Sequence, residues 1–142
     1  EIHIRQACAR FVLREDLMVV ARERGSNRPV VFTGLHRIDW QVRRMEIGYW
    51  CRKDAQGRGF VSESTNALAR YAFAVLQARA VAISHADGND RSRLVAERLN
   101  FRPEGRMRNH DITNDGIVRD SLWHSHTEVN DLPQLDVQWG EP

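Results

Sequence analysis

The chain has 142 residues, of which 42% are hydrophobic and 28% charged, and its 21 basic and 19 acidic residues give a net charge of +2. A chain of this size and composition can bury one core, which predicts a single soluble globular domain rather than a disordered segment. The near balance of charge, with arginines interleaved among acidic residues, argues against a nucleic-acid-binding domain. No apolar run approaches the roughly 18 residues that a membrane span needs.

The cysteines and the first residues bear on where the protein works. Cys8 and Cys51 are too few for a disulfide scaffold, and residues 1–5 lack the apolar stretch of a signal peptide, so we expect a cytoplasmic protein. The first residue is Glu1 rather than Met, and it falls inside a helical pattern. We therefore expect the sequence to start downstream of the natural N-terminus.

Apolar residues at helical spacing predict three helices, and alternating or short apolar runs predict six strands. In chain order these are a helix over 1–15, a hairpin of two strands over 17–37, a strand over 45–51, a helix over 61–77, a strand over 80–84, a helix from Asn89 or Asp90 to Leu99, and two strands over 101–110 and 117–126. This alternation of strands and helices predicts a mixed α/β layer fold.

Local signals refine these elements. Gly48 lies in mid-strand, where a glycine indicates a bulge or a close approach of two backbones. Asn89 or Asp90 can cap the helix that follows, and Asn100 stands where a left-handed residue ends that helix. The segment 114–116, Asn-Asp-Gly, is a strong hairpin signal between the last two strands.

A glycine-rich loop, Gln56-Gly57-Arg58-Gly59-Phe60, separates the 45–51 strand from the next helix. Free backbone amides at the start of that helix, together with its dipole, can form an anion site suited to a pyrophosphate, and Arg58 can add a charged contact. The same residues also fit a plain glycine-rich turn. The loop matches neither the Walker pattern nor the Rossmann fingerprint.

Four motifs resemble those of the GNAT acetyltransferases in type and order: Glu46–Trp50, Ala55–Phe60, Asn89–Arg93 and Ala96–Phe101. The similarity extends over about residues 1–126 and is greatest to the RimJ/RimL-type branch, which acetylates ribosomal-protein N-termini and has relatives acting on small amines. It implies a mixed, mostly antiparallel sheet flanked by helices, formed by residues 1–128 and followed by a tail over 129–142. The first strand and first helix of that fold are expected to be absent from the given sequence.

The resemblance implies acetyl-CoA as co-substrate and no metal. In the family, a Gln/Arg-x-x-Gly-x-Gly/Ala loop binds the coenzyme A pyrophosphate through backbone amides. That pattern falls here on Gln56, Gly59 and Val61, with further amides from Gly57, Arg58, Phe60 and Ser62. Val61 departs from the preferred Gly or Ala, and its branched side chain can crowd the phosphates. The strand edge expected to pair with the pantetheine carries Trp50, Cys51 and Arg52.

The resemblance also implies three catalytic positions: Glu46, Asn89 and Ser92. Glu46 is the candidate general base that removes a proton from the acceptor amine through water, although it can equally be a surface glutamate paired with Arg43 or Arg44. Asn89 is expected at the pantetheine or thioester, and Ser92 near the sulfur, where it can help protonate the leaving thiolate. The alternatives are a helix cap for Asn89 and an ordinary first-turn hydroxyl for Ser92.

Other reactive side chains have simpler interpretations. Tyr49 can protonate the thiolate, but packing in the core is favoured for it. Cys51 is not expected to be a nucleophile, because the family transfers the acetyl group directly and no basic partner is evident. In the tail, we expect an apolar group to pack back on the domain or on a partner: Leu132, Leu135, Val137 and Trp139.

The histidines give no clear metal site. His124 and His126 share a strand face and can bind a metal together with Asp120, but no compact fourth ligand accompanies them and we expect no metal. His85 can line the acceptor site, and His110 is expected in a loop.

The function implied is acetyl-CoA-dependent N-acetylation, in which a primary amine attacks the acetyl group directly in a ternary complex. The acceptor is a protein N-terminus or a small amine, with no nucleic acid or membrane as partner, and an exposed sheet edge favours a homodimer. The alternative is a non-catalytic coenzyme A-binding sensor or scaffold, for which Val61 and the missing N-terminal elements argue.

Overall fold

The computed structural model describes residues 2–113 and 115–135. These residues form a six-stranded sheet with three α-helices and two short 3₁₀ turns. In chain order the elements are α1 (Ile2–Val12), β1 (Leu17–Arg22), β2 (Pro29–Asp39), β3 (Arg44–Cys51), the turn η1 (Lys53–Ala55), α2 (Phe60–Ala74), β4 (Ala80–Ala86), α3 (Asp90–Arg98), β5 (Arg102–Ile112), β6 (Val118–His126) and the turn η2 (Val129–Asp131).

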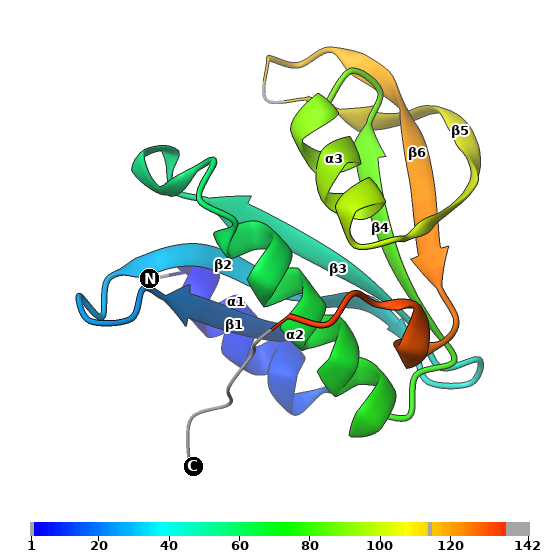
Figure 1. Ribbon diagram of the computed structural model, residues 1–142. Coiled ribbons are helices and arrows are strands. Elements are labelled where there is room, and N and C mark those ends of the chain that lie inside the picture. Colours follow the sequence, from blue (N-terminus) through cyan, green and yellow to red (C-terminus); the bar gives the residue numbers. More distant parts are fainter. Residues whose placement is uncertain (1, 114, 136–142) are drawn as a thin grey trace.

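The sheet is mixed and mostly antiparallel, as predicted. Its strand order is β1-β2-β3-β4-β6-β5, and only the β3–β4 pair is parallel. A parallel pair needs a crossover connection, and α2 supplies it. Helices α2 and α3 lie on one face of the sheet and α1 on the other (Figure 1). None of the described helices is long and apolar enough to cross a membrane.

Successive side chains of β3 point to opposite faces of the sheet. Met45 and Ile47 are fully buried with Leu68 of α2, whereas Trp50, on the other face, is 61% exposed. The main core therefore lies between the sheet and the α2 and α3 layer. Its fully buried members also include Leu35, Ala69, Ala72, Val81, Ile83, Ala96 and Leu99.

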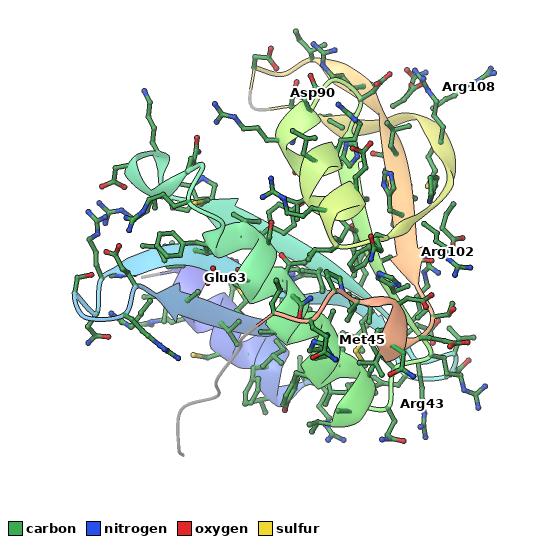
Figure 2. The ribbon with its side chains drawn as sticks, in the orientation of Figure 1. Arg43, Met45, Glu63, Asp90, Arg102 and Arg108 are labelled. Atoms are coloured by element: carbon green, nitrogen blue, oxygen red, sulfur yellow. The ribbon has the colours of Figure 1, made fainter. Side chains whose placement is uncertain are left out.

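Strands β3 and β4 pair over only three residue pairs before they separate. These are Arg44 with Ala80, Met45 with Val81 and Glu46 with Ala82. Beyond them the two strands diverge, which opens the sheet into two parts (Figure 1). Met45, labelled in Figure 2, is buried at this junction. The facing edges of the two strands past the junction keep backbone groups without a strand partner.

Two predicted helices end earlier than the apolar pattern suggested. The first ends at Val12, where Arg14 soon turns left-handed with φ of 60°, and α2 ends at Ala74, before Gln77 with φ of 57°. A left-handed residue breaks the helical hydrogen-bond series whatever side chains follow it. Asn100, also left-handed with φ of 61°, follows α3 as predicted.

The segment after β6 packs against the domain. Leu132 is buried in the main core, and the Pro133 carbonyl accepts hydrogen bonds from Asn66 Nδ2 at 2.9 Å and Arg70 Nη2 at 3.0 Å, both on α2. The expected packing of the apolar tail is thus seen for Leu132. Val137 and Trp139 lie outside the described residues.

Candidate active site

Two clefts meet where β3 and β4 separate. The first, of about 360 Å³, lies in the gap between these strands and is lined by Tyr49, His85, Asn89 and Ser92. The second, of about 580 Å³, lies on the α1 side of the sheet and includes Arg10, Asp16, Arg37 and Glu46. Gly48 lines both clefts, so the site spans the sheet at that residue.

Asn89 and Ser92 are joined at the start of α3, as expected for a helix cap. Asn89 Oδ1 accepts a hydrogen bond from the Ser92 amide at 3.2 Å, which makes Asn89 the helix cap rather than Asp90. Because the cap uses only the side-chain oxygen, the side-chain NH₂ group of Asn89 stays available to another partner. Both residues line the first cleft.

Tyr49 faces the same cleft from β3. Burial raises the pKa of its phenol, and the Ser92 hydroxyl offsets part of that rise. The Tyr49 hydroxyl is buried, and Ser92 is near enough to influence its pKa but does not form a hydrogen bond with it; no other described residue forms one either. A buried phenol without a partner is costly, so this oxygen is available to a group entering the cleft.

His85 lines the first cleft rather than the second, which holds Glu46, and its ring mostly packs inside the protein. It stacks on His124 with ring centroids 5.3 Å apart, and both rings are buried. Burial, and then the neighbouring His85, lower the pKa of His124. His110 lies within β5, with Nδ1 3.1 Å from Ser121 Oγ, so its placement in a loop was wrong.

Glu46 lies in the second cleft with only 12% of its side chain exposed. One carboxylate oxygen accepts a hydrogen bond from Arg37 Nη1 at 2.6 Å, and the other accepts one from the Ser84 hydroxyl. The alternative of a surface pair with Arg43 or Arg44 is therefore not what the structure has. Each oxygen retains a further lone pair, so the carboxylate can still accept from a ligand.

Arg37 was missed by the sequence analysis. It sits where the β2–β3 register shifts between His36 and Asp39, and its backbone is left-handed with φ of 46°. This irregularity directs its guanidinium to Glu46 and over the Trp123 ring, 6.0 Å from the ring centroid. Strand periodicity cannot reveal such a position, because a bulge interrupts the alternation of apolar and polar residues along the strand.

The glycine signal at Gly48 marks a close approach rather than a bulge. Gly48 pairs with Gly34 across β2 and β3, and the His36 ring lies over both. A Cβ on Gly48 would be 3.0 Å from His36 Cδ2. The ring is held by Asp16, whose Oδ1 is 3.3 Å from His36 Nδ1 and whose Oδ2 is 3.0 Å from Arg10 Nη1.

The glycine-rich loop turns into α2 through two left-handed glycines, Gly57 with φ of 76° and Gly59 with φ of 86°. Gly59 is the N-cap of α2 and provides no side-chain hydrogen bond, so the first amides of the helix have no intrahelical partner. Gln56 spans the mouth of the gap, since it donates from Nε2 to the Cys51 carbonyl at 3.4 Å and accepts from Arg91 of α3.

Side chains beside this loop are fixed by packing and charge. Val61 and Phe60 pack against a small cluster of Val30, Val31 and Ala55, and Arg58 pairs with Glu23 on the β1–β2 turn. The Val61 side chain is thereby used in packing. Figure 2 labels Glu63 of α2 and Asp90 of α3, which lie in the first turns of the two helices flanking the gap.

The remaining residues of the expected strand edge are Trp50 and Cys51, at the end of β3, and Arg52, directly after it. Trp50 contacts Phe32, with ring centroids 5.7 Å apart, and Arg52 is bound to Asp54 at 3.1 Å. Burial, and then the Asp54 charge, raise the pKa of the Cys51 thiol, which keeps it protonated and agrees with excluding it as a nucleophile.

The described residues contain no cluster of three or more His, Cys, Asp or Glu side chains that could hold a metal. Asp120, the carboxylate considered with His124 and His126, is bound to Arg106 at 2.6 Å and to the Asn109 amide at 2.9 Å.

The sequence matches the family model described as Acetyltransferase (GNAT) domain over residues 3–102. The protein named "Putative ribosomal N-acetyltransferase YdaF" in Bacillus subtilis (strain 168) is 40% identical over 91 residues, which cover 64% of this chain and 49% of that protein. The aligned part thus spans about half the length of this relative.

Solved structures share the fold. A probable acetyltransferase superposes with a TM-score of 0.83 at 29% identity, over 92% of this chain and 72% of that one. A mutant of spermidine N-acetyltransferase SpeG from Vibrio cholerae gives 0.79 at 18% identity, over 90% and 75% of the two chains. Microcin C7 self-immunity acetyltransferase MccE, in complex with acetyl-CoA and AMP, gives 0.79 at 21%, over 89% and 68%. At their identities, the last two show similarity of fold alone. Because the family match covers most of the sequence and the observed sheet agrees with it, this chain belongs to the GNAT acetyltransferase family.

Proposed function

We propose that this protein transfers an acetyl group from acetyl-CoA to a primary amine. The observation that carries the proposal is the meeting of the two clefts at Gly48, with Glu46 in one and Asn89 and Ser92 in the other. Direct transfer needs a base beside the amine and a separate place for the thioester. The arrangement offers both, on the two sides of the opening between β3 and β4.

The residues around the opening fit acetyl-CoA, which supplies the activated acetyl group when bound. The edge of β3 that faces the gap offers backbone groups to the pantetheine, with Trp50 and Cys51 at the end of the strand and Arg52 directly after it. The unpaired amides at the start of α2 suit the pyrophosphate, with Gln56 and Arg58 beside them. The packing of Val61 against the cluster of Val30, Val31 and Ala55 supports a pyrophosphate site that its side chain does not crowd.

The proton transfers follow from the side chains in each cleft. The Glu46 carboxylate accepts a proton from the acceptor amine, directly or through water, because only the neutral amine has a lone pair for attack. The Ser92 hydroxyl, assisted by Asn89, donates toward the sulfur as the carbon–sulfur bond breaks. Backbone amides of β3 polarise the acetyl carbonyl.

The identity to YdaF supports the RimJ/RimL-type branch, since that relative is named a ribosomal N-acetyltransferase. We propose an acceptor that is a protein N-terminus or a small amine, and a cytoplasmic location. The catalytic domain would be residues 1–128, followed by the tail. A homodimer stays a prediction that sedimentation can test, with the edge strand β1 as one surface for pairing.

Replacing Glu46 with Gln tests the proposal. Gln keeps the size and can still accept from Ser84 but cannot take up a proton, so we expect kcat/KM for an acetylated amine to fall about 100-fold. The matched control is Glu97→Gln, which removes the charge of an exposed pair with Arg93 on α3 and lies outside the lining of both clefts. A value of kcat/KM for Glu46→Gln that equals the wild type across pH would remove Glu46 as the base.

The alternative, a coenzyme A-binding sensor or scaffold, differs in one measurable respect. Either protein would be stabilised by acetyl-CoA, by about 2.7 kcal/mol at 100 times Kd. Only the enzyme would also release free thiol in the presence of an amine panel. A rise in Tm without thiol release therefore favours the sensor, and no rise at all contradicts both.

A further inference from the structure

The second cleft has its charges arranged by depth. The carboxylates of Asp16 and Glu46 lie at the bottom, with side chains 10% and 12% exposed. The guanidinium groups of Arg10 and Arg37 lie at the mouth, with side chains 61% and 63% exposed. Glu15, which is exposed, also lines the cleft, so an acceptor meets two guanidinium groups and one carboxylate before it reaches the two buried carboxylates.

Each arginine uses only part of its binding capacity inside the protein. Arg10 Nη1 binds Asp16 at 3.0 Å, and Arg37 Nη1 binds Glu46 at 2.6 Å. A guanidinium carries five N–H donors in a planar fork. Among the described residues, no further hydrogen bond is made by either guanidinium, so several donors at the mouth remain available for an anionic group.

The position of Arg37 depends on an unusual backbone. It is left-handed, with φ of 46°, at the point where the β2–β3 register shifts. Such conformations are unfavourable for a residue with a Cβ and are concentrated at functional sites. Here the strained residue places a cation beside the carboxylate proposed as the base.

We propose that the acceptor carries a negatively charged group close to its reactive amine. This inference rests on the proposed function and specifies its substrate class. The amine would bind at Glu46, and the carboxylate or phosphate would bind Arg37 and Arg10 at the mouth. A polyamine fits this cleft poorly, because its second ammonium would lie against two guanidinium groups.

Three peptides of matched size test the charge preference: Gly-Asp-Gly-amide, Gly-Asn-Gly-amide and Gly-Lys-Gly-amide. We expect kcat/KM to decrease in that order, with the Asp peptide about three- to tenfold above the Asn peptide, a range typical of partly exposed charge pairs. Spermidine should be a poorer acceptor than the Asp peptide. A Lys peptide or spermidine that equals or exceeds the Asp peptide would overturn the proposal.

Variants assign the preference to the two arginines. Arg37→Gln and Arg10→Gln should each bring the Asp-to-Asn ratio of kcat/KM toward one, and Arg37→Glu should favour the Lys peptide. A disturbance of Glu46 would lower kcat/KM for the Asp and Asn peptides alike, so it would not change their ratio. The control is Arg108→Gln, on β5 (Figure 2), which is not among the residues lining the second cleft and should leave the ratio unchanged.

The outcomes distinguish a failure of this inference from a failure of the proposed function. If all the peptides are acetylated and neither Arg37→Gln nor Arg10→Gln alters the Asp-to-Asn ratio of kcat/KM, this inference is overturned. The proposed function then still stands. If acetyl-CoA raises Tm and no acceptor of any charge is acetylated, the proposed function fails, and the acceptor class fails with it.

Discussion

Glu46 and Arg37 illustrate what can be known of a single side chain from sequence. The face that Glu46 occupies follows from strand alternation, and the family motif draws attention to it. Its partner does not follow, because Arg37 and Glu46 are brought together by the pairing of β2 with β3 and by an irregularity within β2. Asn89 and Ser92 drew attention because they belong to one short local motif, whereas Asp16 and His36 belong to none. Tyr49 was expected in the core, and it packs against the core.

The buried His124 ring makes stability depend on pH. Burial and the nearby His85 hold the pKa of His124 below its ordinary value of 6.5. As pH falls below about 6.5, the unfolded chain takes up this proton before the folded one does, so the free energy of unfolding decreases. The contribution of His124 to the free energy of unfolding should be fully retained above that pH. Below it, the free energy should decline by at most about 1.4 kcal/mol per pH unit.

Denaturant unfolding between pH 5 and 8 measures this slope, and His124→Gln should reduce it. An NMR titration of the His124 ring protons gives the folded pKa independently. A slope that the variant leaves unaltered would show that other groups cause the acid sensitivity.

At the scale of elements, most of the fold was accessible from the sequence. The apolar periodicity of each helix and strand is local, so the order of elements was predicted correctly. Helix ends were less accurate, since left-handed residues at Arg14 and Gln77 have no distinctive sequence signal. The separation of β3 from β4 was implied only by the family resemblance, because pairing between strands far apart in sequence leaves no local pattern.

The loop before α2 allows a test at this scale. Gly59 has φ of 86° and Gly116, in the β5–β6 turn, has φ of 79°; a Cβ on Gly116 would meet no atom within 4 Å, and one on Gly59 would meet only Glu63 Oε1, in ordinary contact at 3.7 Å. Alanine at each should therefore cost a similar amount, about 1–2 kcal/mol, through backbone conformation alone. Only Gly59→Ala should also weaken acetyl-CoA binding, by threefold or more, because it shifts the amides at the start of α2.

Calorimetric titration with acetyl-CoA and denaturant unfolding, done on both variants, separate the two effects. Equal affinity in Gly59→Ala and Gly116→Ala would mean that these amides do not bind the cofactor.

At the scale of the whole molecule, the segment after β6 closes the core. Leu132 is 3% exposed in the main core, whereas Leu135, three residues on, is 36% exposed. We expect Leu132→Ala to lower the free energy of unfolding by about 2–5 kcal/mol and Leu135→Ala to change it by less than about 0.5 kcal/mol. Denaturant unfolding of both variants measures the difference, and similar values for the two would show that this segment is not part of the cooperative unit.

The junction of β3 and β4 has a consequence for local opening. Three residue pairs form the whole ladder between the two parts of the sheet, from Arg44 with Ala80 to Glu46 with Ala82. Amide protons within β2 and β6, each paired on both sides, should exchange with solvent far more slowly than those of β3 and β4 that face the gap. A molecule that hydrogen-bonds to the β3 edge would slow exchange there first, and so mark its own position along the strand in a deuterium-labelling experiment.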